Sequence, residues 1–596
     1  MQKQVFKLIF LISLFLILPN LTQAAPIPVL NFSDIDSGPK VGNTDGVGSG
    51  AIVTIWGNYL GSATGTSKVY VGNVEATAIY YWKNADGQLP GGPAELYSYH
   101  KMQEIAFAIP ASAPDGLTTI KVVVNGIETN TLPFTVRSGN IYFIKAGGND
   151  TTGNGSWGNA WATLQSTFIG GNNKLTAGDI VYSVGVGTNV GLEIGKNLGI
   201  NGTLAQPISI AQYPGTKINI SGNTNIANTI YYYNTNEFWN WSKISVTTTV
   251  SAFALSRKNR IVGVEITGPT VYGGYSGALG GGCNGDINCF GTEGGKYLGL
   301  YIHNYGTDNG VPSIGNIGTD PSTCPYSNPA CKSTWDRFQH LFYISNRSGG
   351  PREAYEIGWN NLIDNPIAPG IHIYDQSPCG DWTGTMEIHN NVIKNQRGSA
   401  INVDLSNCTP RLLVPFRIYN NIIINDATVA YGGRGITIIA PGRAETPLDQ
   451  IQVYNNTVYG QIQSSNFVNF PTNQVFKNNI FVDTQNVDFF EQYGGSPLVS
   501  SNNLFYSLFA KAAPSWTGTG SIMANPLFID AANFDFPLQP TSPAKTAGSD
   551  ATLAVAPTDF YGQSRPAGSV SMGAIQYVSA VVDTIAPAAP TGLDVI

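Results

Sequence analysis

Two histidines, a tyrosine and an arginine in the middle of the chain have side chains suited to proton transfer beside an acidic group. These four candidate catalytic residues are His340, Tyr343, His372 and Arg434. A neutral histidine or a deprotonated tyrosine can remove the proton next to a carboxylate, and an arginine can stabilise the resulting anion. Together they predict β-elimination on a sugar acid. Against this, a single surface histidine more often makes only a structural hydrogen bond.

Five further polar residues are expected to bind the substrate: Arg347, Tyr374, Asp375, Asn402 and Asp404. A pair of carboxylates on neighbouring strands would instead serve hydrolysis, and Asp375 and Asp404 are the simplest pair. Carboxylates could also hold Ca²⁺, which would neutralise a sugar acid, but exposed aspartates are usually just solvated. We therefore predict no resident metal and keep Ca²⁺ as the alternative.

A repeated phrase with an asparagine pair indicates how these residues are positioned. Its copies read EIGWNNLI, EIHNNVI, RIYNNIII, QVYNNTVY and FKNNIFV, and their first asparagines lie 23 to 35 residues apart. Such a spacing is typical of one coil of a parallel β-helix, in which stacked asparagines can hydrogen-bond between coils at ~4.8 Å. The repeats predict an all-β, right-handed parallel β-helix in which four asparagines form a single ladder: Asn360, Asn390, Asn420 and Asn455.

A second strand follows each asparagine turn, as in HLFYIS, GIHIYD, AINVDL and GITIIA. Alternate apolar residues of these strands should point inward. Alignment of those inward residues predicts one outward row along the solenoid: Tyr343, His372, Asn402 and Thr437. His303 and His389 are expected elsewhere, in a structural stack with Trp359, Tyr419 and Tyr454 just before the asparagine turn.

The first residues read as a signal peptide over residues 1–24, with a basic start, an apolar run and small residues before the cleavage point. Export is therefore expected, to the extracellular space or the cell surface, with no membrane insertion after cleavage. An even number of cysteines in an exported chain favours disulfides, and metal binding by thiolates is the alternative, although CxxC spacing is lacking. Their neighbours in sequence suggest the pairs Cys283–Cys289, Cys324–Cys331 and Cys379–Cys408.

Two known families resemble parts of the chain. Residues 25–137 contain short alternating strands in VTIWGNYLG and VNGIETNTLPFTV and resemble the immunoglobulin-like IPT/TIG family, a small β-sandwich that usually spaces or binds. Residues 141–578 open with IYFIKAGGNDTTGNGSWGNAWATLQ and resemble the pectate-lyase-like right-handed parallel β-helix superfamily. Residues 579–596 read as a Pro/Ala linker and the start of a truncated fibronectin-type segment.

The β-helix resemblance implies a protein that grips a long polysaccharide, but lyases, hydrolases, epimerases and adhesins share this scaffold. The chain lacks the pectate-lyase aspartate cluster, the GHG phrase of pectin hydrolases and the DPHE phrase of mannuronate epimerases. A net charge of −7 gives no electrostatic case for nucleic acid. We predict a secreted, monomeric protein that cleaves an acidic polysaccharide by β-elimination, with a polysaccharide hydrolase or a non-catalytic adhesin as the alternatives.

Overall fold

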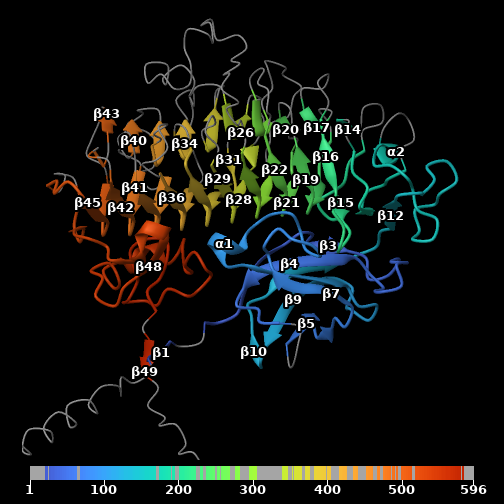
Figure 1. Ribbon diagram of the computed structural model, residues 1–596, viewed down its shortest axis with the longest axis horizontal. Helices are drawn as coiled ribbons and strands as arrows, with labels where there is room; N and C mark the ends of the chain where they lie inside the picture. The colour runs from blue at the N-terminus through green and yellow to red at the C-terminus, as the bar shows by residue number, and fades with distance from the viewer. Residues whose placement is uncertain are drawn as a thin grey trace, which may run out of the picture.

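A computed structural model of the 596-residue chain contains two short α-helices and is otherwise built from strands and 3₁₀ turns over its described residues (Figure 1). The structure describes residues 21–23, 26–62, 67–168, 174–188, 191–194, 200–222, 228–232, 236–247, 251–254, 257–268, 276–281, 294–304, 339–346, 352–353, 355–364, 370–375, 382–396, 399–404, 415–425, 434–439, 451–460, 466–469, 474–484, 486, 488–489, 491–493, 499–512, 517–578 and 580–582.

The N-terminal sandwich packs two sheets around alternating apolar residues, among them Ile105, Ile120 and Phe134, all fully buried. Its antiparallel four-stranded sheet has the order β2 (Val29–Ser33), β4 (Ile52–Asn58), β8 (Gln103–Ala108) and β7 (Ile79–Asn84). The facing sheet has the order β3 (Ser37–Gly38), β11 (Leu132–Val136), β9 (Gly116–Val124), β5 (Lys68–Val71) and β6 (Val74–Glu75), with β10 (Ile127–Glu128) beside β9. The predicted immunoglobulin-like sandwich is confirmed.

Three long parallel sheets form the main body. The 12-stranded sheet runs from β12 (Ile141–Lys145) to β44 (Val499–Ser501), and the 10-stranded sheet runs from β14 (Leu192–Ile194) to β43 (Glu491–Tyr493). The 11-stranded sheet runs from β16 (Asn219–Ser221) to β46 (Ile522–Met523). The chain visits the three sheets in turn and pairs each strand in parallel with its counterpart one coil later. This is the predicted right-handed parallel β-helix.

One coil illustrates the path. It contains β28 (Glu356–Gly358) in the 12-stranded sheet, β29 (Asn361–Ile363) in the 11-stranded sheet and β30 (Ile371–Asp375) in the 10-stranded sheet. The next coil begins with β32 (Met386–His389). The asparagine turn therefore lies between the 12- and 11-stranded sheets.

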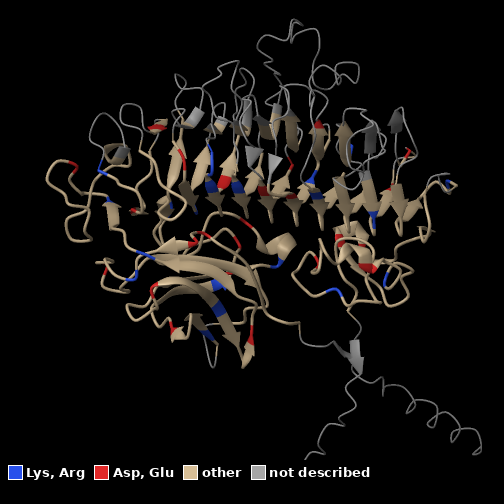
Figure 2. Ribbon diagram, turned by 180° about the vertical axis from the view of Figure 1, so that it is seen from behind, with Lys and Arg blue, Asp and Glu red and all other residues tan. Residues whose placement is uncertain are grey.

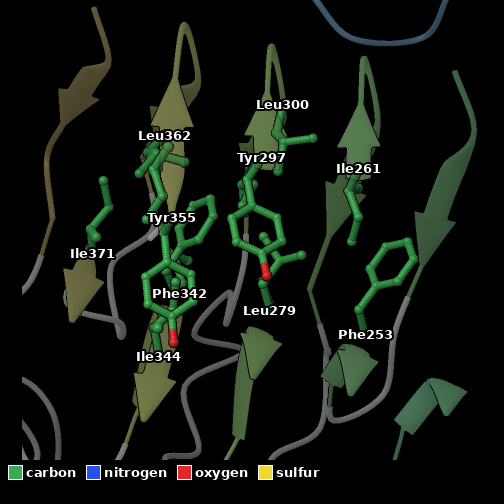
Figure 3. Close-up of a cluster of buried hydrophobic side chains, with 14 of the residues drawn as sticks. Phe253, Ile261, Leu279, Tyr297, Leu300, Phe342, Ile344, Tyr355, Leu362 and Ile371 are labelled. Atoms are coloured by element: carbon green, nitrogen blue, oxygen red, sulfur yellow. The ribbon is translucent and has the colours of Figure 1, made fainter. Parts of the chain in front are cut away.

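Inward residues stack from coil to coil and fill the solenoid. Along the 10-stranded sheet, Phe253, Leu279, Phe342 and Ile371 are successive partners in register, and all four are fully buried (Figure 3). Complete burial of such a side chain stabilises the fold by ~1.5–3 kcal/mol. A slip of one residue would turn the apolar set outward, so this packing also determines which residues face out.

The asparagine ladder lies one residue away from its predicted position. The first turn residue adopts a left-handed conformation, with φ of 51° at Asn390 and 53° at Asn420 and Asn455. The ladder is instead made by the second asparagine of each pair, through Nδ2–Oδ1 hydrogen bonds of 2.8–3.0 Å that join Asn360, Asn391, Asn421, Asn456, Asn479 and Asn503. The predicted single ladder is therefore wrong for Asn390, Asn420 and Asn455. Asn360 belongs to the ladder because Trp359 is the left-handed residue of its coil.

The N-terminal sandwich covers part of the outer face of the 12-stranded sheet. Tyr182 bonds both backbone groups of Ile52 through its hydroxyl, at 2.7 and 2.8 Å. Arg260 donates to the Ser33 carbonyl at 2.6 Å, and the buried ammonium of Lys243 lies 3.6 Å from the Asp34 carboxylate. The sandwich and the solenoid therefore share a buried polar and apolar interface.

The C-terminal segment, residues 525–578, covers the outer face of the 11-stranded sheet. Its Phe528 and Phe560 cluster with outward apolar residues such as Ile422 and Ile480. It also accepts the side-chain hydrogen bonds of the left-handed asparagines, for example from Asn390 Nδ2 to the Phe560 carbonyl at 3.0 Å. Figure 1 shows this segment and the sandwich next to each other along one side of the solenoid.

Several predictions concern residues outside this description. Of the predicted signal peptide only β1 (Leu21–Gln23) is described, paired with β49 (Ala580–Val582). All six cysteines lie outside the described residues, so the proposed disulfides stay predictions. None of the described helices is long and apolar enough to cross a membrane.

Candidate functional site

The predicted outward row follows the 10-stranded sheet. Its four strands are β26 (Gln339–Asn346), β30, β34 (Ile401–Asp404) and β37 (Ile436–Ile439). The Cα partners along them are Tyr343, His372, Asn402 and Thr437. The predicted register is confirmed, and it places four polar side chains on adjacent strands ~4.8 Å apart.

His372 of this row forms a hydrogen-bonded pair with His340, which lies three residues before Tyr343 on β26. His372 Nδ1 lies 3.1 Å from His340 Nε2, and both residues are buried. Tyr343 stacks on His340 with ring centroids 5.0 Å apart, and Tyr374 lies 5.5 Å from His372. The structure therefore brings together four of the predicted site residues in one cluster of rings.

Burial determines the charge of His372. It lowers the pKa of His372 to about 4, because the imidazolium form loses its hydration inside the ring cluster. His372 is consequently neutral near pH 7. Its Nε2 atom is buried and has no hydrogen-bond partner among the described residues, whereas its Nδ1 atom is held by His340. A neutral imidazole of this kind can accept a proton at Nε2 if Nδ1 carries the hydrogen.

Polar residues continue the site on the following coils. Asn402 is the strand partner of His372, and its buried Oδ1 atom has no hydrogen-bond partner in the described part of the chain. Asp404 pairs with Tyr374. Thr437 is held by Ser399, with their hydroxyl oxygens 2.6 Å apart. The half-buried Arg434 lies just before β37. This strand is the second one after that of His372, a spacing of ~10 Å across the sheet.

The two aspartates proposed for hydrolysis lie on adjacent strands, one register position apart. Asp404 is the partner of Tyr374 on the outward row, whereas Asp375 is the next residue along β30 and the partner of Asn346. The Asp375 side chain and the whole of Arg347 lie outside the described residues.

An additional short ladder joins the two coils that carry the histidine pair. β27 (Arg352–Glu353) and β31 (Trp382–Thr383) pair in parallel across the turns that follow β26 and β30. The coils that carry His340 and His372 are thus joined by backbone pairing beyond the three sheets. Within the described residues, no group of three or more His, Cys, Asp or Glu side chains could hold a metal ion. The Ca²⁺ alternative stays a prediction.

The predicted stack before the asparagine turn contains His389 but not His303. His389 stacks on Tyr419 with ring centroids 5.0 Å apart and contacts Trp359 edge-on at 4.5 Å, so it belongs to the expected stack. His303 does not. It lies on β25 (Tyr301–His303) beyond the turn, where its ring nitrogen contacts Glu265 at 3.1 Å. The prediction is wrong for His303 because Asn304 belongs to a different turn, the one after β25. In that coil the turn between the 12- and 11-stranded sheets has Gly299 as its left-handed residue.

Comparison with known proteins identifies the N-terminal sandwich. Residues 35–136 match the family model of the IPT/TIG domain. No curated protein matches the chain. Among solved structures, one described as pectate lyase Pel9A is similar over 74% of this chain and 96% of its own, with 13% identity and a TM-score of 0.43. This similarity is too low to assign an activity. The function must therefore be argued from the site itself.

Proposed function

We propose that the chain binds an acidic polysaccharide along the outer face of the 10-stranded sheet and cleaves it by β-elimination, with His372 as the base. The observation that carries this proposal is the hydrogen bond between His340 and His372 inside a cluster of tyrosine rings. That contact fixes one ring nitrogen of His372 and leaves the other for chemistry.

The proton transfer assigns a role to each histidine. Nε2 of neutral His372 takes the proton next to the uronate carboxyl group, and the C–H electron pair forms the new double bond. The C–O bond at the adjacent carbon breaks, and the leaving sugar oxygen takes a proton from water. His340 accepts the hydrogen bond from His372 Nδ1 and acts as a positioning residue. A bound uronate carboxylate would raise the pKa of His372, because a nearby negative charge favours the imidazolium form.

Residues farther along the row would hold the rest of the chain. Asn402 and Asp404 offer amide and carboxylate groups for sugar hydroxyls on the next coil. Arg434 would neutralise the carboxylate of a neighbouring sugar unit, because guanidinium groups bind carboxylates in a bidentate manner.

The test is a screen of the purified protein against pectate, alginate and a glucuronan. A lyase releases products with a new conjugated double bond that absorbs in the ultraviolet. His372→Gln should lower that rate ~10²–10⁴-fold, as expected for loss of a general base. The matched control is His303→Gln, which removes a histidine outside the row and should leave the rate unchanged.

The outcomes separate the three candidate functions. New reducing ends without ultraviolet absorbance would show a hydrolase, and binding without products would show an adhesin; either result would overturn the elimination proposal. Full lyase activity in His372→Gln would show that the base lies elsewhere.

A further inference from the structure

A second polar row lies on a different face of the solenoid, the outer face of the 12-stranded sheet. Five outward residues on successive strands are register partners: Lys296, Glu356, Glu387, Arg417 and Gln452. Lys296 pairs with Glu356 at 2.9 Å, and Arg417 pairs with Glu387 at 3.2 Å. The four charges cancel, so the row is polar but carries no net charge. Figure 2 shows basic and acidic positions interspersed along the solenoid.

Aromatic rings line one side of this row. His389 lies between Trp359, which it meets edge-on at 4.5 Å, and Tyr419, on which it stacks at 5.0 Å. Gly358 makes room for the histidine ring, because a Cβ atom at this position would lie 2.8 Å from His389 Nε2. A methyl group could not fit there without displacing the ring, so the backbone is adapted to the position of His389.

Two buried polar atoms of this row, Arg417 Nε and Gln452 Oε1, have no hydrogen-bond partner in the described part of the chain. The neighbouring His389 Nε2 lies 3.7 Å from Glu356 Oε1. His389 is only 4% exposed, and its other ring nitrogen contacts Asn390 Oδ1 at 3.0 Å. Unsatisfied buried polar groups destabilise a fold, which is why native proteins usually satisfy them. Arg417 Nε requires an acceptor, and Gln452 Oε1 requires a donor.

The row is also enclosed by the two parts that cover the solenoid. Trp359 packs on Phe32 of the N-terminal sandwich with ring centroids 5.2 Å apart. At the other end, Tyr454 clusters with Val555 of the C-terminal segment. Five strands span ~19 Å, long enough for several units of an extended chain. Junctions between packed units are frequent places for ligand sites.

We propose that this row is a second carbohydrate-binding site, and that its ligand is a neutral glycan. A hydroxyl group can donate to Gln452 and also accept from Arg417, so hydroxyl-rich sugars match both demands. The cancelling charges give no preference for an acidic chain. Tyr419 and Trp359 supply half-buried apolar surface for the hydrophobic edges of sugar rings. This site is independent of the proposed elimination at His372.

Affinity electrophoresis of the full chain in gels containing galactomannan, mixed-linkage β-glucan or arabinoxylan tests the proposal. We expect at least one of these neutral polymers to retard the protein. Gln452→Leu and Arg417→Met should each weaken the retardation ~10-fold or more, the usual effect of losing a hydrogen bond to a buried or charged group. Lys217→Met, a surface lysine away from the row, and His372→Gln should bind like the unmodified protein.

Three results would overturn the proposal of a second binding site. The proposal is wrong if none of the three neutral polymers retards the protein, or if Gln452→Leu and Arg417→Met bind them normally. It is also wrong if these variants lose binding only to pectate or alginate. Circular dichroism of each variant must match the unmodified protein. His372→Gln distinguishes the two sites, because it should lower the elimination rate ~10²–10⁴-fold and retain binding to the neutral polymer.

Discussion

The asparagine ladder makes a quantitative prediction about stability. Asn421 is fully buried and takes part in four hydrogen bonds. Its Oδ1 atom accepts from the backbone and the side chain of Asn391 at 3.1 and 2.9 Å, and its Nδ2 atom donates to the Ile388 carbonyl and to Asn456 Oδ1, both at 2.9 Å. Asn421→Ala would remove all four bonds and leave buried polar groups on both neighbouring coils.

The magnitude follows from those groups. A hydrogen bond contributes a net ~1 kcal/mol, and a buried group left without a partner costs ~1–3 kcal/mol. We therefore expect Asn421→Ala to lower the free energy of unfolding by about 3–5 kcal/mol, measured by urea titration followed by circular dichroism. The matched control is Asn402→Ala, the same substitution on the outward row, which should change stability by no more than ~0.5 kcal/mol. A loss below ~1 kcal/mol for Asn421→Ala, or equal losses for both variants, would refute the reasoning.

Three further predictions concern titration and oxidation. Burial raises the pKa of Glu104 to about 7, so its ionisation destabilises the fold progressively as the pH rises from about 4.5 to 7. The melting temperature of Glu104→Gln relative to that of the unmodified protein should therefore be higher at pH 8 than at pH 5. An equal difference in melting temperature at the two pH values would contradict this. Burial lowers the pKa of His372 to about 4, so stability should fall as the pH drops from about 6.5 to 4. His372→Gln should therefore reduce the fall in melting temperature over this pH range. An unchanged fall in the variant would count against a neutral His372 in the folded protein. Thiol titration of the denatured, unreduced protein should find no free cysteine, and two or more free thiols would disprove the proposed pairing.

The repeats in the sequence predict the solenoid because they combine two independent signals. Alternating apolar residues such as Ile371 and Ile373 determine which side chains face inward, and the coil-length spacing of the asparagine pairs determines which strands are neighbours. Both signals are local, so the outward row from Tyr343 to Thr437 is predictable without coordinates. The ring cluster is less so, because the contact between His340 and His372 depends on side-chain rotamers.

The errors have a common physical origin. Each asparagine pair contains one residue for the left-handed turn and one for the ladder. The amino-acid sequence alone does not show which asparagine has which role. In the coil of Asn360 the left-handed residue is Trp359, which shifts the apparent repeat by one position. Residues of the second polar row also occur in the repeated asparagine phrases, in which Glu356, Glu387 and Arg417 precede the asparagine turn. Its ion pairs and unsatisfied atoms become apparent only when the strands are stacked.

The chemistry of the outward residues differs among the three faces, and this difference argues for a functional row. Where the C-terminal segment covers the 11-stranded sheet, outward positions such as Val392 and Ile422 are apolar and are buried by phenylalanines of that segment. Those positions are explained by packing alone. Tyr343, His372 and Asn402 on the 10-stranded sheet are polar or aromatic, and the buried His372 Nε2 atom has no partner among the described residues. Packing against the solenoid alone would favour apolar residues at these positions, since leaving a buried nitrogen unsatisfied costs stability. The retention of polar groups there is therefore better explained by a ligand that contacts them.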